Sequence, residues 1–221
     1  MAETGTRTVQ RALTLLSAVA QDGGTLSQLA RAAELSPSTA SRLLATLAGQ
    51  ELVRRDEHGH YHAGARLRQL AAASLRADPL HELAGAHLRA LADETGETAN
   101  LAVAADGERI VYVRQVASPK LVQTAAWAGR TIPRRGTALG LALDGEVNAR
   151  GYVARSGAVE PDVTSIAAPV LGPDRQIVAA LSVLAPTFRV TAERIEACGR
   201  AVARHAGELS RGLGAPEASA A

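Results

Sequence analysis

The stretch SPSTASRLLATL, which runs from Ser36 to Leu47, decides the fold. Pro37 suits the first position of a helix, because the N–H that proline lacks would be unpaired there, and Ser36 suits the capping position before it. The apolar residues that follow recur with the spacing of one buried stripe, so the opposite face of the helix is polar. The stripe is Ala40, Leu43, Leu44 and Leu47, and the polar face is Ser38, Thr39, Ser41, Arg42 and Thr46.

Another helix precedes this one with almost no room between the two. Thr25 and Gln28 have the spacing of a capping box, in which each side chain pairs with an otherwise unpaired backbone N–H. Only two residues separate Ala33 from Ser36, so the chain must turn sharply into the next helix, as in a helix-turn-helix. The inner face of this preceding helix is predicted to be Leu26, Leu29, Ala30 and Ala33.

A first helix and a hairpin complete this part of the chain. The pattern predicts a helix over Thr8–Gln21, ended by the glycines of the stretch DGG. Leu52 and Val53 enter a strand that turns at residues 57–59 and returns through Tyr61. Three helices and a two-stranded wing form a winged helix-turn-helix domain. The inner face of the first helix is predicted to be Val9, Ala12, Leu13, Leu16 and Val19 or Ala20.

In a helix-turn-helix, the polar face of the second helix enters the major groove of DNA. An arginine there reaches guanine O6 and N7 with two hydrogen bonds, and serine and threonine hydroxyls meet phosphates or base edges. Two alternatives stay open: Ser36 serves mainly as the helix cap, and Arg54 and Arg55 are a solvated strand edge rather than phosphate ligands. The predicted DNA-binding residues are Ser36, Ser38, Thr39, Ser41, Arg42, Arg54 and Arg55.

The composition limits the class of protein. A chain of 221 residues is long enough for two domains. Residues 1–76 hold nine arginines and six acids, whereas the remainder holds fifteen lysines or arginines and sixteen acids, so the positive excess is N-terminal and compatible with a polyanion partner. The single cysteine, Cys198, excludes an internal disulfide, and neither a membrane span nor a leader peptide is evident. We expect a soluble, cytoplasmic protein.

Two further helices are predicted after the wing. Residues Arg66–Ala77 form a connector helix. Asp78 and Pro79 then supply the cap and the first position of a helix that runs to about Glu94. The inner faces are predicted to be Leu67, Leu70, Ala71 and Leu75 in the connector and Leu80, Leu83, Ala84, Leu88 and Leu91 in the next helix.

A region of strands follows. TANLAVAA (98–105) and RIVYVRQV (109–116) flank the favoured turn dipeptide Asp106–Gly107, and KLVQTAAWAG (120–129) adds a third strand. The loop RRGTALGLAL leads into a short helix, and a final helix runs from Thr191 to about Gly212. The second domain is therefore α+β and mostly antiparallel, with its helices packed on one side. The other predicted strands are RGYVARSG (150–157), SIAAPVLG (165–172) and QIVAALSVLAP (176–186).

The order of these parts resembles the IclR family of bacterial transcriptional regulators. SPSTASRLLATL and SIAAPV…AALSV carry the resemblance most specifically, and it spans Val9 to Leu213. It implies a winged helix-turn-helix joined by a linker helix to a GAF-like α+β effector-binding domain. It also implies a homodimer or dimer of dimers, joined through the first helix and the linker helix, on double-stranded operator DNA. The predicted domains are residues 1–65 (DNA-binding), 66–77 (linker helix), 78–213 (effector-binding) and 214–221 (disordered tail).

The resemblance also implies a pocket for a small-molecule effector. The matching motifs lie on one strand, around the glycine loop and on the later strands. Arg155 favours an anionic ligand, since its guanidinium pairs with two oxygens, or else it lies in solvent. We expect the effector to be a carboxylate or an aromatic metabolite. The implied pocket residues are Leu121, Thr124, Trp127, Ile132, Ala138, Leu139, Arg155, Ser165 and Ala167.

Two features depart from the family pattern. The chain runs from Leu143 through DGEVNA to Arg150 almost directly, where the family usually inserts a helical segment, so part of the pocket wall is expected to be missing. The loop before SIAAPV reads RSGAVEPD, with Arg155 and Ala158 where the family commonly carries acidic residues.

Three other functions are alternatives to a regulator with an effector. His58, His60 and His62 would share one face of an extended segment, as metal ligands do, but the glycine between the first two breaks that geometry. An enzymatic function lacks candidate catalytic residues. Cys198 is predicted to be a small apolar residue of the core, and no GxSxG, P-loop or HExxH motif occurs. The third alternative is a regulator whose shortened C-terminal domain only dimerises, in which Trp127 packs in the core and binds no ligand. We predict no catalytic residue, no metal and no cofactor.

Overall fold

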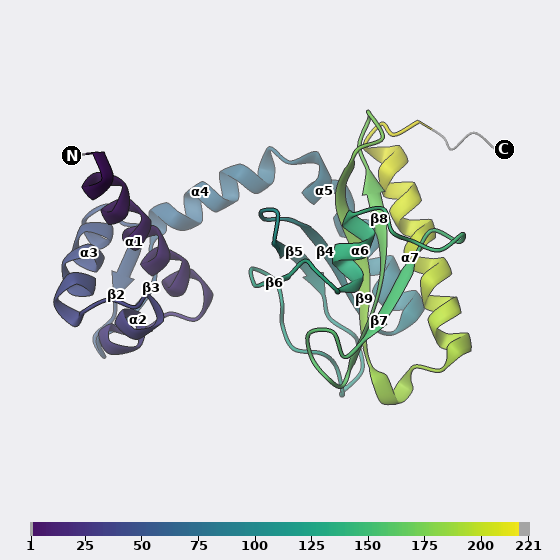
Figure 1. Cartoon of the computed structure of the whole chain (residues 1–221), viewed down its shortest axis with the longest axis horizontal. Coiled ribbons are helices and arrows are strands. Elements are labelled where there is room, and N and C mark those ends of the chain that lie inside the picture. The colour runs from purple at the N-terminus through teal and green to yellow at the C-terminus, as the bar shows by residue number, and fades with distance from the viewer. Residues whose placement is uncertain (1, 217–221) are drawn as a thin grey trace. The chain divides into compact units, whose positions relative to one another are not determined.

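The computed structural model describes residues 2–216, with side chains from residue 6 onward (Figure 1). The chain divides between Ala77 and Asp78 into two compact units. Each unit has a hydrophobic core of its own. No helix within the described residues is long and apolar enough to cross a bilayer.

The N-terminal unit packs three helices against a small sheet and ends in a fourth helix. The sheet is antiparallel, with the strand order β1-β3-β2. The helices are α1 (Ala2–Gln21), α2 (Leu26–Ala32), α3 (Pro37–Gly49) and α4 (Ala65–Arg76), and the strands are β1 (Gly24–Thr25), β2 (Val53–Arg55) and β3 (His60–Ala63). The core consists of Leu15, Val19, Leu29, Ala30, Ala40, Leu43, Leu44, Leu47, Val53 and Tyr61.

Both predicted caps of the helix-turn-helix are confirmed. The Gln28 side chain accepts a hydrogen bond from Thr25 N at 2.8 Å, and Thr25 Oγ1 accepts one from Gln28 N. Ser36 Oγ accepts from Thr39 N at 3.3 Å. Between the two helices Glu34 has φ 54°, a left-handed conformation that reverses the chain within the short turn. The predicted buried stripe of α3 is also confirmed.

The prediction for α1 is wrong in its start and in part of its buried face, although Ala12, Leu16 and Val19 pack against the core as predicted. The helix begins at Ala2 rather than Thr8. Val9 and Leu13 are 58% and 56% exposed, whereas Leu15, which was not predicted, is fully buried. Apolar residues recur at helical spacing on two faces of α1, so periodicity alone does not say which face meets the core. The face with Val9 and Leu13 has no cover within the described chain.

One other predicted inner face is exposed, and a second is confirmed except at one residue. α4 buries none of its residues, and its predicted stripe includes Leu70 at 55% and Leu75 at 40% exposure. In α5 (Pro79–Thr95), Leu83 is 38% exposed instead of inward. Gly85 is buried in that helix, because the Arg114 guanidinium packs where a side chain would otherwise stand.

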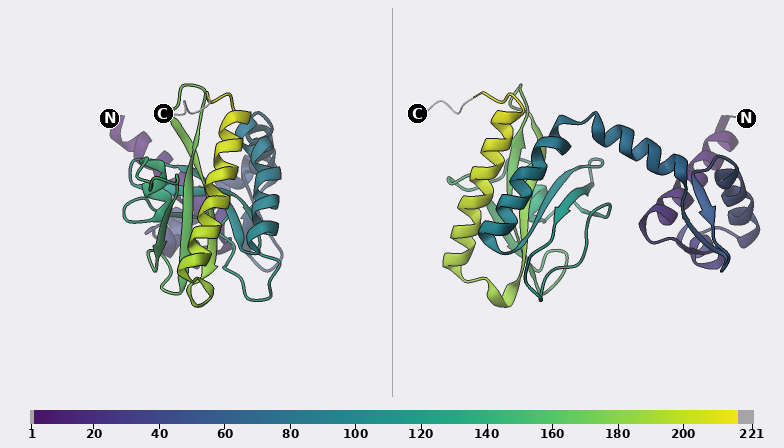
Figure 2. Two further views of the ribbon diagram at one scale, coloured as in Figure 1. Left: turned by 90° about the vertical axis from the view of Figure 1, so that its right-hand side faces the viewer. Right: turned by 180° about the vertical axis from the view of Figure 1, so that it is seen from behind.

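The C-terminal unit is a six-stranded antiparallel sheet with the order β6-β5-β4-β9-β8-β7. α5 and α7 lie side by side on one face (Figure 2), and the short α6 packs on the other. The α+β class is confirmed, but the prediction that all helices lie on one side is wrong for α6. The helices after α5 are α6 (Ala138–Leu143), the 3-10 turn Thr187–Arg189 and α7 (Ala192–Gly212). The strands are β4 (Thr98–Ala104), β5 (Arg109–Val116), β6 (Thr131–Pro133), β7 (Val153–Ser156), β8 (Val163–Leu171) and β9 (Ile177–Pro186).

The predicted third strand over residues 120–129 does not form. The segment is an irregular loop, and within residues 120–133 only the short β6 forms strand pairs with β5. One side chain replaces a strand ladder here: Gln115 Nε2 donates to Ala125 O at 3.3 Å, and Gln115 Oε1 accepts from Trp127 N at 2.7 Å. The stretch also has few of the β-branched residues that favour a strand.

The end of the chain differs in part from the predicted tail. Ala215 is buried, and its N–H donates to Ser210 O at 2.9 Å, so the chain packs against the end of α7 as far as Pro216. The rest of the predicted disordered tail, residues 217–221, lies outside the described residues.

Candidate functional site

The exposed face of α3 is the first candidate site. Ser38, Ser41 and Arg42 are exposed on it. Among the described residues, the Arg42 guanidinium has neither a hydrogen-bond partner nor an ion-pair partner. The face therefore presents one free cation among short hydroxyl side chains, which are the groups that contact phosphates and base edges.

The other two hydroxyls of the predicted set are engaged locally. Ser36 Oγ caps α3, lies 3.1 Å from Ser38 Oγ and bonds Thr39 Oγ1 at 2.9 Å. Thr39 is half-buried beside it. The structure thus supports the alternative in which Ser36 serves mainly as a helix cap.

Asp56 organises the tip of the wing. Its Oδ1 accepts from the backbone N–H groups of His58 at 3.0 Å and His60 at 2.9 Å, and its Oδ2 lies 2.7 Å from His62 Nε2. The hydrogen bond from His62, aided by that of His60, lowers the pKa of Asp56 to about 2. Gly59 has φ 83° in this turn, and the three histidines do not meet as ligands in the described wing.

The two wing arginines differ in their surroundings. Arg55 Nε donates to Gly59 O at 3.4 Å, and its guanidinium lies 5.5 Å from the centre of the Tyr61 ring. Arg54 is exposed and makes no side-chain contact of this kind within the described chain. Arg54 is therefore the freer of the two for a phosphate.

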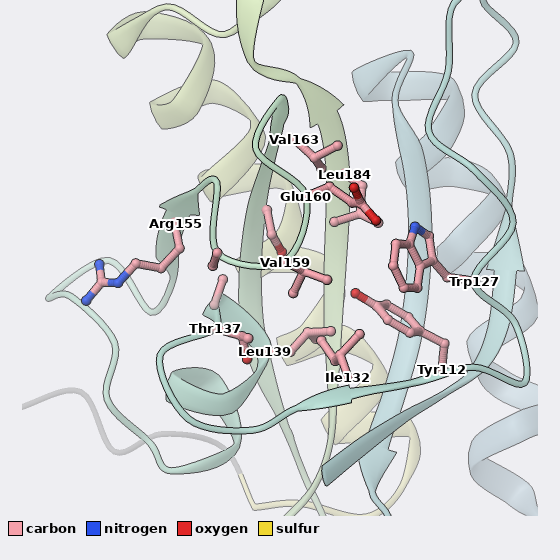
Figure 3. Close-up of a pocket in the computed structure, with 13 residues that line it drawn as sticks. Tyr112, Trp127, Ile132, Thr137, Leu139, Arg155, Val159, Glu160, Val163 and Leu184 are labelled. Atoms are coloured by element: carbon pink, nitrogen blue, oxygen red, sulfur yellow. The ribbon is translucent and has the colours of Figure 1, made fainter. Parts of the chain in front are cut away.

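A pocket in the C-terminal unit is the second candidate site (Figure 3). It lies on the sheet face opposite α5 and α7, and it encloses about 390 Å³ when its open mouth is included. Tyr112 and Trp127 form one wall, with ring centres 5.7 Å apart and planes tilted by 42°. Burial raises the pKa of Tyr112, so its phenol stays a neutral hydrogen-bond donor. The lining is Tyr112, Trp127, Ile132, Thr137, Ala138, Leu139, Arg155, Ala158, Val159, Glu160, Val163, Ser165 and Leu184.

The two charged residues of the lining point in different directions. The Arg155 side chain extends away from the aromatic pair, and its Nη1 donates to Ala154 O at 3.0 Å. The Glu160 carboxylate instead points toward Trp127 and Leu184 (Figure 3). The structure thus favours the alternative in which Arg155 lies in solvent, and the charge nearest the aromatic wall is negative.

The pocket contains six of the nine residues that the resemblance implied: Trp127, Ile132, Ala138, Leu139, Arg155 and Ser165. Leu121 does not line it and is 99% exposed, because the strand expected to carry it is a loop. Thr124 lies on the same loop outside the lining, and Ala167 is buried under α6.

Several lining residues were missed, and some had a signal in the sequence. Side chains alternate across a strand, so Val163 and Ser165 share the face of β8 that meets the pocket. Leu184 then follows from register, because it pairs with Ser165 across β8 and β9. The loop residues Val159 and Glu160 carry no such signal.

Unpaired polar atoms add to the chemistry of this sheet face. The Ser165 Oγ in the lining has no hydrogen-bond partner, nor do the buried Asn100 Oδ1 and Ser182 Oγ of the neighbouring strands. Asn100 and Ser182 pair across β4 and β9. Buried polar groups are normally satisfied, so these atoms leave a ligand or water something to bind.

A group of ionisable side chains outside the pocket was also missed. His87 on α5 meets His205 and Glu208 on α7, with the two histidine Nδ1 atoms 3.3 Å apart. Burial, together with His205, lowers the pKa of the His87 imidazole. The two histidines are 118 residues apart, and no motif spacing joins them.

The comparisons with known proteins agree with this architecture. Residues 8–57 match a family model described as the IclR helix-turn-helix domain. Residues 72–144 and 145–211 match the model of the bacterial transcriptional regulator IclR C-terminal domain. The two pieces meet between Asp144 and Gly145, where the sequence analysis places the missing segment.

Individual relatives resemble the chain over nearly its full length. The HTH-type transcriptional regulator BhcR of Paracoccus denitrificans is 28% identical, covering 95% of this chain and 88% of that protein. The transcriptional repressor IclR of Escherichia coli is 27% identical, covering 94% and 90%. An IclR homologue of Microbacterium hydrocarbonoxydans, crystallised with 4-hydroxybenzoate, shares the fold with a TM-score of 0.74 at 22% identity, covering 93% of this chain and 98% of that one.

Proposed function

The chain belongs to the IclR family of bacterial transcriptional regulators, which are not enzymes, and we propose that it acts as a homodimer or dimer of dimers on specific operator DNA under the control of a small effector. Its family makes it a helix-turn-helix DNA-binding regulator with an effector-binding C-terminal domain. The observation that carries the finer proposal is the exposed face of α3, where Arg42 stands free among hydroxyls.

Sequence-specific binding divides between two sets of residues in this proposal. Arg42 and the neighbouring Ser38 and Ser41 read base edges in the major groove, while Ser36 and Thr39 hold the helix N-terminus at the backbone. Arg54 and Arg55 bind phosphates and supply affinity that is independent of sequence and falls with salt. Since its partner is operator DNA, the protein acts in the cytoplasm.

The dimer is supported by apolar faces that the chain itself leaves uncovered. Val9 and Leu13, four positions apart on α1, are exposed, and so are Leu70 and Leu75 on α4. Such faces mark protein contacts when they are contiguous. Two recognition helices related by a two-fold axis then enter major grooves about 34 Å apart or a multiple of it.

The effector proposed for the C-terminal pocket is a small, flat aromatic molecule that carries a carboxylate or hydroxyl. Tyr112 and Trp127 offer ring surfaces, and the Tyr112 and Ser165 hydroxyls offer donors. The bound homologue from Microbacterium hydrocarbonoxydans carries a ligand of this kind.

The DNA-binding proposal is tested by fluorescence anisotropy. Purified full-length protein is titrated onto labelled DNA from upstream of its own gene, with unrelated DNA as competitor, at two salt concentrations. We expect binding that survives the competitor and weakens with salt. Binding to operator candidates from across its genome that never exceeds binding to the competitor, with and without effector candidates, would contradict a sequence-specific regulator.

The effector proposal is tested by the fluorescence of Trp127, the only tryptophan of the chain. Titration with 4-hydroxybenzoate, benzyl alcohol and benzylamine distinguishes anionic, neutral and cationic aromatics. We expect Glu160→Gln to tighten binding of the anion about 3- to 10-fold, because one repelling charge is removed from a partly solvated site. Glu57→Gln, which removes an exposed acid of the wing, is the matched control. Unchanged fluorescence with all three compounds would favour a domain that only dimerises.

A further inference from the structure

The side chains of His87, His205 and Glu208 meet between α5 and α7, on the sheet face opposite the pocket. These two helices lie side by side (Figure 2). His205 is 8% exposed, while His87 and Glu208 are 23% and 37% exposed. The group is therefore anchored inside the helix pair and open to solvent on one side. His205 and Glu208 are three positions apart on α7, so they project from the same face of that helix.

The spacing of the three ligand atoms matches a metal centre. His87 Nδ1 and His205 Nδ1 are 3.3 Å apart, and each lies 3.7 Å from Glu208 Oε2. A tetrahedral ion with bonds of about 2.0–2.1 Å holds its ligand atoms about 3.3–3.4 Å apart, so the three atoms already surround such a position with small adjustment. We propose that His87, His205 and Glu208 bind a divalent transition-metal ion of the Zn²⁺ type.

The surroundings of the cluster are those of a metal site. The second nitrogen of His205, Nε2, lies 3.3 Å from Arg204 Nη2 and 3.4 Å from Glu94 Oε2, and a carboxylate beside the outer nitrogen is the arrangement that orients metal-binding imidazoles. Arg204 in turn bonds the Glu94 carboxylate and lies 3.9 Å from Glu208 Oε1. Two carboxylates and one guanidinium leave a net negative charge beside the histidines, which favours a dication.

The donor set limits the class of ion. Two imidazoles and one carboxylate suit Zn²⁺ and its neighbours among the divalent first-row metals, whereas Mg²⁺ and Ca²⁺ prefer oxygen ligands. Three protein ligands leave a fourth position for water on the exposed side. The ion joins α5 to α7 across 118 residues of sequence, and it stabilises the C-terminal unit independently of the effector pocket.

The experiment is a calorimetric titration of the chelator-treated, full-length protein with ZnCl₂. We expect one ion per chain with micromolar or tighter affinity. His87→Ala and Glu208→Gln should each weaken binding by at least about 10- to 100-fold, the range that loss of a supporting residue alone costs. His58→Ala, which removes an exposed histidine of the wing, is the matched control and should bind like the wild type.

Stability and spectroscopy provide the second readout. Zn²⁺ should raise the unfolding midpoint reported by Trp127 in the wild type and in His58→Ala, but not in His87→Ala. Co²⁺ should give visible absorption typical of a tetrahedral site, and Glu208→Gln should abolish it. Absence of Zn²⁺ binding by the wild type, equal binding by all variants, or loss of binding in His58→Ala would each overturn the proposal. DNA binding is measured separately, so the two proposals fail or stand independently.

Discussion

The recognition helix and the pocket differ in how the chain encodes them. The cluster proposed to face DNA lies mainly within residues 36–42, and a local cap and a local apolar stripe orient it. The pocket instead draws on residues between Tyr112 and Leu184, and its shape depends on strand register and on two irregular loops. A site made from one helix can be read from periodicity, while a site assembled from many segments depends on packing that periodicity does not encode.

The largest expected effect comes from a substitution that destabilises only the C-terminal unit, which contains the pocket. A Cβ atom at Gly140 would lie 1.7 Å from the backbone oxygen of Arg134, so Gly140→Ala must move α6 away from its loop. We expect a loss of about 3 kcal/mol or more in the free energy of unfolding, measured by urea denaturation with Trp127 fluorescence. Gly107→Ala is the control, because it lies in the same unit and a Cβ there meets nothing within 4 Å. An unchanged midpoint in Gly140→Ala would mean that α6 is not held as described.

A buried ion pair provides a second test of long-range packing. Glu97 is 2% exposed, and its carboxylate bonds Lys120 Nζ at 2.7 Å and Arg189 Nη2 at 2.9 Å. Glu97→Ala should cost about 2–3 kcal/mol of unfolding free energy, at or below the low end for a broken buried pair, because the two cations left behind are 40% and 22% exposed and can hydrate. The same denaturation assay measures it. Asp106→Ala, which removes an exposed pair with Arg109, should change the midpoint far less.

The local site is tested by changing its free cation. Arg42→Ala should lower the preference for operator over competitor DNA by about 1–3 kcal/mol per half-site, measured by anisotropy, and leave the Trp127 denaturation curve unchanged. Arg54→Ala should instead lower the slope of affinity against salt for all sequences. Equal discrimination by Arg42→Ala and the wild type would remove Arg42 from the interface.

The smallest effect is expected at the wing, where the stability of the N-terminal unit depends on pH through Asp56. The pKa of Asp56 is lowered from 3.8 to about 2 in the folded protein. The carboxylate therefore contributes stability above about pH 4, and that contribution is lost as the pH falls toward 2. Asp56→Asn should lower the thermal midpoint of the helical signal slightly at pH 6 and not at pH 2. A difference that grows on acidification would contradict the role of the His62 hydrogen bond.

The elements that were predicted correctly are those for which the local residue pattern indicates one type of secondary structure. Ser36, Pro37 and the stripe through Leu47 indicate a helix, and the two apolar runs of β8 and β9, joined by a turn at residues 172–175, indicate a pair of strands. Part of the buried face of α1 was misassigned because its apolar residues spread over two faces, with Leu15 on one and Leu13 on the other. Only the tertiary core decides between them.

The parts that were not predicted depend on contacts between distant residues. Gln115 holds the loop at Ala125 and Trp127 in place of a strand, and nothing in the sequence of residues 120–129 indicates that partner. His87 and His205 meet only because α5 and α7 pack together. Glu160 faces the aromatic wall because of the loop between β7 and β8.

The direct connection between α6 and β7 has a kinetic consequence. Asp144 closes it with an ion pair to Arg134 at 2.6 Å, and Gly145 turns the chain at φ 77°. With so little chain on that side, the loop from β7 to β8 is the cover that a ligand must cross on its way in and out. A single thin cover makes exchange fast, so we expect short residence times. Such a regulator follows the concentration of its effector from moment to moment instead of retaining a memory of past exposure.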